Sequence, residues 1–183
     1  MILLDQAGIE QALPRVLDGL RKYRWLQAAL LETDVTHDRE FQSRFNGFYR
    51  VRRNADWRSV FYNILQEEKS EPRAFTEVLH ELHGATGRIE ASFASKLSAT
   101  VDPSKPVIDS IILKNLSLRL PRYGTVPTRM VRIVELHDRL TQIFSDYLGT
   151  EMGRYLLTRF EESYPNAQLT RVKMLDLVLW QTR

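Results

Sequence analysis

Apolar residues recur at spacings of three and four along almost the whole sequence. Such spacing places them on one face of an α-helix, whereas a half-buried β-strand requires strict alternation of apolar and polar residues. The apolar stripes lie in the following segments: 9–28, 41–49, 57–65, 75–82, 89–97 and 130–147. The pattern therefore predicts an all-α fold, a bundle of eight or nine short helices.

Turn and cap residues set the expected boundaries of these helices. Pro14 must begin or bend the first one, and the two prolines within 102–106 forbid a helix there. Asp and Thr are favoured N-caps, so Asp109 is expected to begin a short buried helix, and Thr128 the long helix that follows a loop over 121–128. Helices are accordingly expected over 15–31, 107–116, 151–163 and 170–182.

The composition supports one hydrophobic core. The 183 residues are 43% hydrophobic, which suffices for a single compact domain over 1–183 without disulfides or metals. The absence of cysteine excludes disulfide bridges, thiolate metal sites and cysteine nucleophiles, and we expect no metal and no cofactor. The N-terminus lacks the features of a secretory signal, and no apolar run approaches the ~20 residues of a membrane span. These features predict a cytoplasmic protein with no membrane contact.

Positive charge gathers in one stretch that is rich in aromatic residues. The net charge is only +3, from 26 Lys and Arg against 23 Asp and Glu, which argues weakly for an anionic partner. Six arginines nevertheless fall within twenty residues: Arg39, Arg44, Arg50, Arg52, Arg53 and Arg58. We expect Arg50, Arg52 and Arg53 to contact an anionic partner. The aromatic residues between them could fill a gap in a base stack, although such stripes more often belong to a core.

A glycine turn joins two expected helices within 76–100. Gly84 and Gly87 lie three residues apart just before the second helix, where unpaired backbone N–H groups and the helix dipole favour a phosphate. Arg88 adds a cation beside that position. The alternative is an ordinary connection between helices, in which the glycines only supply left-handed backbone.

Three segments resemble one family of proteins in the same chain order. The run Gly-Ala-Thr-Gly-Arg-Ile-Glu-Ala-Ser over 84–92 is similar to the hairpin of the helix-hairpin-helix DNA glycosylases, above all the compact archaeal-type 8-oxoguanine glycosylases. Residues 107–113 resemble the family's segment with the catalytic aspartate, which here is Asp109, and residues 175–180 resemble its closing helix. The resemblance implies a helix-hairpin-helix element, double-stranded DNA as partner and excision of modified or damaged bases.

One departure from this family concerns its Schiff-base lysine. Ile89 occupies that position here, and an isoleucine side chain cannot form an imine. Lys96 lies seven residues further on, a displacement of roughly 10 Å along a helix, so we expect Lys96 to bind DNA rather than to replace the missing nucleophile. The prediction is a monofunctional N-glycosylase with Asp109 as the catalytic carboxylate, which stabilises the developing sugar cation.

Other interpretations remain open at this point. Asp109 has an equally good explanation as a plain helix N-cap. The chain could also keep the fold as a DNA-binding module without catalysis, or serve as a helical adaptor whose arginine-rich stretch meets an acidic protein. His80 and His83 are spaced i, i+3, whereas the zincin pattern requires i, i+4. No motif identifies the base or the oligomeric state.

Overall fold

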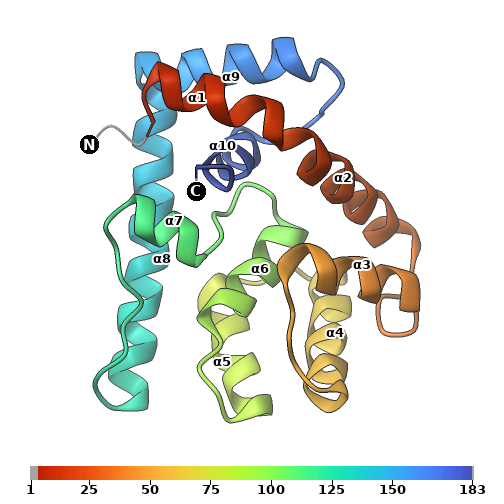
Figure 1. Ribbon diagram of the computed structural model, residues 1–183. Coiled ribbons are helices and arrows are strands. Elements are labelled where there is room, and N and C mark those ends of the chain that lie inside the picture. Colours follow the sequence, from red (N-terminus) through yellow and green to blue (C-terminus); the bar gives the residue numbers. More distant parts are fainter. Residues whose placement is uncertain (1–3, 183) are drawn as a thin grey trace.

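Helices make up all the regular secondary structure in residues 4–182, the part of the chain that the computed structural model describes (Figure 1). The α-helices have these bounds: α1 Gln6–Ala12, α2 Val16–Glu32, α3 Arg39–Tyr49, α4 Ala55–Ser70, α5 Phe75–Thr86, α6 Ala91–Val101, α7 Ser110–Asn115, α8 Val126–Gly149, α9 Glu151–Ser163 and α10 Arg171–Leu179. A 3-10 turn at Leu13–Arg15 joins α1 to α2 at Pro14. The predicted all-α fold is confirmed.

Side-chain caps begin several helices, among them α7 at the predicted cap Asp109. Asp38, Asn54 and Asp109 each accept a hydrogen bond from a backbone N–H in the first turn of α3, α4 and α7. The predicted cap of α8 is wrong, because Thr125 accepts from the N–H of Thr128 and the helix begins at Val126. Proline is tolerated in the first turn of a helix, where its missing N–H has no partner to lose. The last helix also ends earlier than predicted, at Leu179.

The core is built around α10. Seven of the nine residues of this helix are buried, from Lys173 to Leu179, because α10 packs against α1, α2, α7, α8 and α9. Figure 1 shows α10 inside the molecule, with α1 and α9 above it and α8 along one side. A single cluster of buried apolar residues extends from Leu4 to Leu179, which agrees with one compact domain.

Most aromatic residues of the arginine-rich stretch belong to this core, whereas Phe48 is half-buried. Phe45 is fully buried between Phe41 and Phe61, and Trp57 stacks on Phe61 with ring centroids 5.3 Å apart. Tyr49 is also buried. These rings therefore stabilise the packing of α3 on α4, and the interpretation as core is confirmed.

A long connection without helix leads from α7 into α8. In Figure 1 it runs alongside α8 before the chain turns back into that helix. Leu116, Leu118 and Leu120 are buried or half-buried, whereas Ser117 and Arg119 between them are exposed. This alternation holds the connection against the body of the protein and turns its polar side chains outward. None of the helices in the described residues has both the length and the apolar character that a bilayer crossing requires.

Candidate active site

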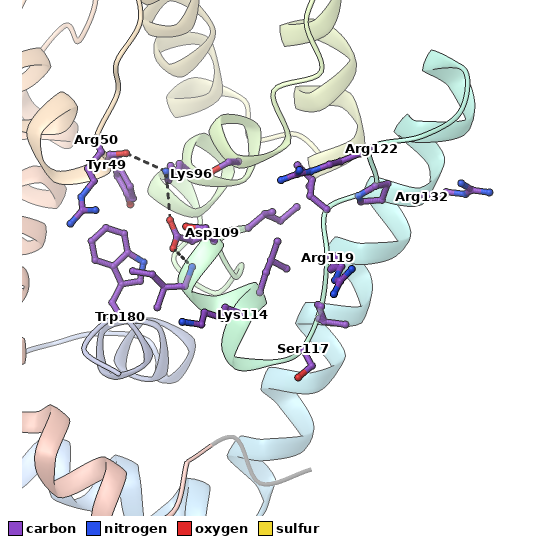
Figure 2. Close-up of a pocket in the computed structure, with 18 of the residues that line it drawn as sticks. Tyr49, Arg50, Lys96, Asp109, Lys114, Ser117, Arg119, Arg122, Arg132 and Trp180 are labelled. Carbon is purple, nitrogen blue, oxygen red and sulfur yellow. Dashed lines mark hydrogen bonds and ion pairs between the residues drawn. The ribbon is translucent and has the colours of Figure 1, made fainter. Parts of the chain in front are cut away.

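A cleft of about 1210 Å³ opens between the end of α3, α6, α7, the connection after α7, and α8. Figure 2 shows its two sides. Lys96 lies on α6 near Tyr49 and Arg50, whereas Arg119, Arg122 and Arg132 lie on the α7–α8 connection and α8. Trp180, just after α10, closes one end of the cleft. The site thus combines side chains from distant parts of the sequence.

Cations dominate the walls of this cleft. Its lining includes six of them: Arg50, Lys96, Lys114, Arg119, Arg122 and Arg132. Asp109 is the single carboxylate in the same lining. Lys114, Arg119, Arg122 and Arg132 are exposed, and none of these four forms an ion pair with another described residue. Unpaired like charges gathered in a cleft raise the local concentration of anions and favour an anionic ligand.

Asp109 lies at the floor of the cleft, and hydrogen bonds hold it in a fixed position. Its Oδ1 accepts a hydrogen bond of 2.8 Å from the N–H of Ile111, which makes it the N-cap of α7. The preceding backbone is fixed as well, because the N–H of Ile108 donates to Ser95 Oγ of α6 at 2.9 Å. The other carboxylate oxygen, Oδ2, lies 4.0 Å from Lys96 Nζ. Asp109 is therefore a helix cap and a cleft residue at once, and the two interpretations from the sequence are compatible.

Lys96 is the partner of Asp109 at this floor. Its Nζ donates a hydrogen bond of 3.2 Å to the backbone carbonyl of Tyr49, and only 8% of its side chain is exposed. Burial lowers the pKa of the Lys96 ammonium, and the charge of Arg50 adds to this effect, while the carboxylates of Asp109 and Asp176 oppose it. A lysine of this kind carries a larger neutral amine fraction than a solvated one.

The position of Lys96 corrects one premise of the sequence analysis. The displacement of roughly 10 Å was reckoned from Ile89 within one helix, but α6 begins only at Ala91 and Ile89 precedes it. Because the chain folds back after α6 and places Asp109 against that helix, Lys96 reaches the carboxylate directly. A buried lysine offers little surface to a DNA backbone, and DNA binding by Lys96 stays a prediction.

A second cavity of about 390 Å³ adjoins the cleft and shares Tyr49, Arg50 and Trp180 with it. The rings of Phe48 and Trp180 line it, nearly parallel with centroids 6.3 Å apart, and the Arg50 guanidinium lies 5.6 Å from the Trp180 ring centroid. The cavity is thus partly bounded by flat aromatic surfaces.

A buried ion pair contributes to the polar lining of this second cavity. Lys173 Nζ lies 2.6 Å from Asp176 Oδ2. Burial lowers the pKa of Lys173, but the Asp176 carboxylate more than offsets this and the pKa is raised overall. The other oxygen, Asp176 Oδ1, is buried and has no hydrogen-bond partner among the described residues. It is an acceptor that a ligand with an N–H group could satisfy.

The glycine turn differs from its prediction. Gly84 lies within the last turn of α5, and only Gly87 has left-handed backbone, with φ of 67° at the end of that helix. Before α6 stands Glu90, a buried carboxylate that pairs with Arg53 at 2.9 Å and with Arg88 at 3.4 Å. A carboxylate therefore occupies the neighbourhood where a phosphate was expected, and these two arginines are engaged with it.

The arginine-rich stretch over 39–58 does not form one surface. Arg44 pairs with Glu40 at 2.7 Å and covers the Trp25 ring, while Arg39 and Arg58 line a separate groove. Arg52 is exposed but does not line the cleft. Of this stretch, Arg50 is the arginine that reaches the cleft, as left-handed backbone with φ of 54° turns the chain there.

The cations of the α7–α8 region are not among the residues predicted from the sequence. A signal was present, because residues 110–134 contain five Lys and Arg and no Asp or Glu: Lys114, Arg119, Arg122, Arg129 and Arg132. An absence of nearby carboxylates, rather than a density of arginines, marks cations that stay unpaired.

The described residues contain no group of three or more His, Asp or Glu side chains arranged to hold a metal ion. No protein-family model, curated protein or solved structure matches this chain. The geometry of the cleft is therefore the basis for assigning a function.

Proposed function

We propose that this protein binds double-stranded DNA in the cleft and hydrolyses the N-glycosidic bond of a modified or damaged base. The observation that carries this proposal is the Asp109 carboxylate, which lies beside Lys96 at the floor of a cleft whose other charged residues are all cations. A DNA substrate also places the activity inside the cell, as the sequence predicts.

The cations of the cleft supply the affinity in this proposal. Each Lys or Arg that neutralises a phosphate releases condensed counterions, so DNA binding of this kind weakens steeply with salt. Arg119, Arg122 and Arg132 are exposed and unpaired within the described residues, so a phosphate displaces no existing partner. Binding at this wall thus costs no broken ion pair.

Asp109 supplies the chemistry. A base in a duplex must be extruded before an enzyme can act on it, and the sugar then lies in the active site. As the glycosidic bond breaks, the departing base takes the electron pair and the sugar acquires positive charge, which a fixed carboxylate stabilises. Oδ1 of Asp109 is held by the Ile111 N–H, which leaves Oδ2 for this role and for the water that attacks C1′. The water gives its oxygen to C1′ and one proton to Oδ2, and that proton balances the negative charge of the departed base.

The second cavity is suited to the extruded base. Its volume of about 390 Å³ exceeds that of a nucleobase, and Phe48 and Trp180 offer the flat apolar surfaces on which bases stack. Asp176 Oδ1 would accept a hydrogen bond from a base N–H, which satisfies an acceptor that is otherwise buried without a partner. This cavity adjoins the cleft that Asp109 lines, because the two spaces share Tyr49, Arg50 and Trp180.

A second candidate mechanism is favoured by the lowered pKa of Lys96 and its closeness to Asp109. In this route the neutral amine, instead of water, attacks C1′ and displaces the base with its bonding electrons. Opening of the sugar ring then yields an imine between Lys96 and the sugar. The excision of the base is common to both routes, and only the nucleophile differs.

Substitution of Asp109 tests the proposal. Asp109→Asn keeps the shape and the N-cap of α7, because Asn caps a helix about as well as Asp, but it removes the negative charge. The variant leaves the buried Lys96 ammonium without this carboxylate, so we expect a modest loss of stability, whereas base release from a panel of modified duplexes should fall by about a hundredfold or more. Single-turnover assays beside melting curves measure both.

The Ala variant is the control for capping. Asp109→Ala removes charge and cap, at a cost of about 1 kcal/mol in stability. Base release that survives in Asp109→Asn would remove this residue from the mechanism. DNA binding without base release from any duplex would support the non-catalytic module, and no DNA binding at low salt would leave the protein–protein adaptor.

Borohydride trapping separates the two nucleophiles. The water route, which follows from Ile89 at the usual lysine position, predicts no covalent adduct with DNA. An adduct that is lost in Lys96→Gln and retained in Lys114→Gln, an exposed lysine of the same cleft, would establish Lys96 as the nucleophile.

A further inference from the structure

Tyr123 is the most exposed large apolar side chain among the described residues, at 86%. It lines the rim of the cleft and directly follows Arg122. Two further exposed apolar side chains, Val126 at 43% and Val131 at 58%, follow within the first turns of α8. Leu31 is exposed to a similar degree, at 83%, but it lies on α2 and does not line the cleft.

Left-handed backbone brackets the segment that carries Tyr123. Ser117 has φ of 54° and Gly124 has φ of 112°, so the chain changes direction at both ends of 117–124. Near the first bend the N–H of Leu118 donates to the carbonyl of Leu113 at 2.8 Å. These features and the inward leucines of this connection fix the backbone of the segment. Little backbone entropy is therefore lost when the exposed Tyr123 side chain binds a partner.

The charge around Tyr123 indicates the class of partner. Residues 110–134 contain no Asp or Glu, and Arg119 and Arg122 stand exposed and unpaired on the same segment as Tyr123. An aromatic ring among such cations is the combination with which proteins hold nucleic acid, because the cations follow the phosphates and the ring stacks on a base. An apolar protein partner would leave these charges desolvated without compensation.

We propose that Tyr123 inserts into the base stack of double-stranded DNA beside the nucleotide that occupies the cleft, while Arg119 and Arg122 hold the neighbouring phosphates. The inference rests on the proposed function and adds to it the form of the substrate. An extruded base leaves a gap in a duplex, and enzymes that extrude bases fill such gaps with apolar or aromatic side chains. A single strand offers no such gap.

The experiment measures the affinity for a duplex that contains one tetrahydrofuran abasic site, at several salt concentrations. Tyr123→Ala is expected to weaken binding about 5- to 150-fold, the range found when one aromatic side chain stacks on one base. The slope of log affinity against log salt should stay unchanged, because no charge is removed. Tyr123→Phe and Tyr123→Trp should bind as the parent does.

Two matched variants complete the design. Leu31→Ala removes an equally exposed apolar side chain away from the cleft and should leave the affinity unchanged. Arg122→Ala, the residue next to Tyr123, should reduce the salt slope by about 0.9, the value for one phosphate contact. The two readouts thus separate stacking from charge.

Three results would overturn the inference. If Tyr123→Ala binds the duplex as tightly as Leu31→Ala does, the Tyr123 ring makes no contact with the DNA. Tyr123→Phe as weak as Tyr123→Ala would assign the effect to the hydroxyl group instead of stacking. A larger loss on single-stranded RNA than on the duplex would assign the ring to another nucleic acid. If Tyr123→Ala has no effect but Arg122→Ala still weakens DNA binding, this inference fails and the proposed function survives. If the parent protein binds no DNA, both proposals fail.

Discussion

Arg44 and Arg53 form ion pairs with Glu40 and Glu90, whereas Arg119, Arg122 and Arg132 form no ion pair among the described residues. Both groups are arginines on or near helices, and the first comes from the denser stretch of positive charge. The difference lies in the residues that surround them. Arginines near glutamates are engaged in holding the fold, and arginines without such neighbours are left for a ligand.

The contrast also explains why total charge is a poor guide here. The net charge of +3 hides a segment, 110–134, that carries five cations and no carboxylate. A long-range field depends on the local balance of charges and not on the total for the chain. The net charge is +5 over 110–134 and +4 over 39–58, so the two regions differ little in charge, but only 110–134 is free of carboxylates.

The largest expected effect comes from neutralising the unpaired cations. The triple variant Arg119→Gln, Arg122→Gln and Arg132→Gln removes three phosphate contacts, and it should lower the slope of log affinity against log salt by about 2.7. Because these side chains are exposed, the melting temperature should not change. Fluorescence anisotropy with a labelled duplex at increasing salt measures the slope.

The matched control neutralises three arginines of the other region, Arg39→Gln, Arg44→Gln and Arg52→Gln, which do not line the cleft. This variant removes the same formal charge, so any general effect of charge appears in both. An equal loss of slope in the two variants would break the comparison and would return the arginine-rich stretch to the binding surface.

A smaller effect, on stability, is expected when Glu90, the buried partner of Arg53, is changed. Glu90→Gln leaves the Arg53 guanidinium without its charged partner in a largely buried setting, and the unfolding free energy should fall by about 1–2 kcal/mol. Glu40→Gln breaks an exposed i, i+4 pair with Arg44 and should cost less than about 0.5 kcal/mol. Urea unfolding curves of the two variants compare these values.

The Glu90→Gln variant also tests whether the glycine turn binds phosphate. Glu90→Gln releases Arg53 and Arg88 from their carboxylate. If this variant binds DNA with a steeper salt slope than the parent, the turn before α6 is a phosphate site that Glu90 normally blocks. An unchanged slope leaves the cleft as the DNA-binding surface.

The helical fold could be predicted from the sequence because its causes are local. Apolar spacing of three and four marks α3 to α6, and Asp109 caps α7 as expected. The start of α8 was misplaced because Pro127 suggested a loop, although proline suits a first helical turn. Errors of this size arise where one residue type, such as proline, is common both in loops and in the first turn of a helix.

The site could be predicted only in part because its causes are not local. Asp109 was predicted as an N-cap from its position and as a site residue from the family resemblance, and it caps α7 and lines the cleft. Lys96 meets Asp109 only because the chain folds back after α6, which no periodicity encodes. The pairing of Arg53 with Glu90 joins residues 37 positions apart and likewise has no signature in the sequence. What decided the role of each cation was its neighbour in space.

Photo-cross-linking tests most directly whether DNA lies along the unpaired cations. A duplex substituted with 5-iododeoxyuridine is bound to the protein and irradiated, and the tryptic peptides that carry nucleotide mass are identified by mass spectrometry. The account predicts cross-links in the peptide Tyr123–Arg129 and its neighbours in 115–132, next to the cleft. Cross-links confined to the peptides Glu40–Arg44 and Asn54–Arg58 would contradict it.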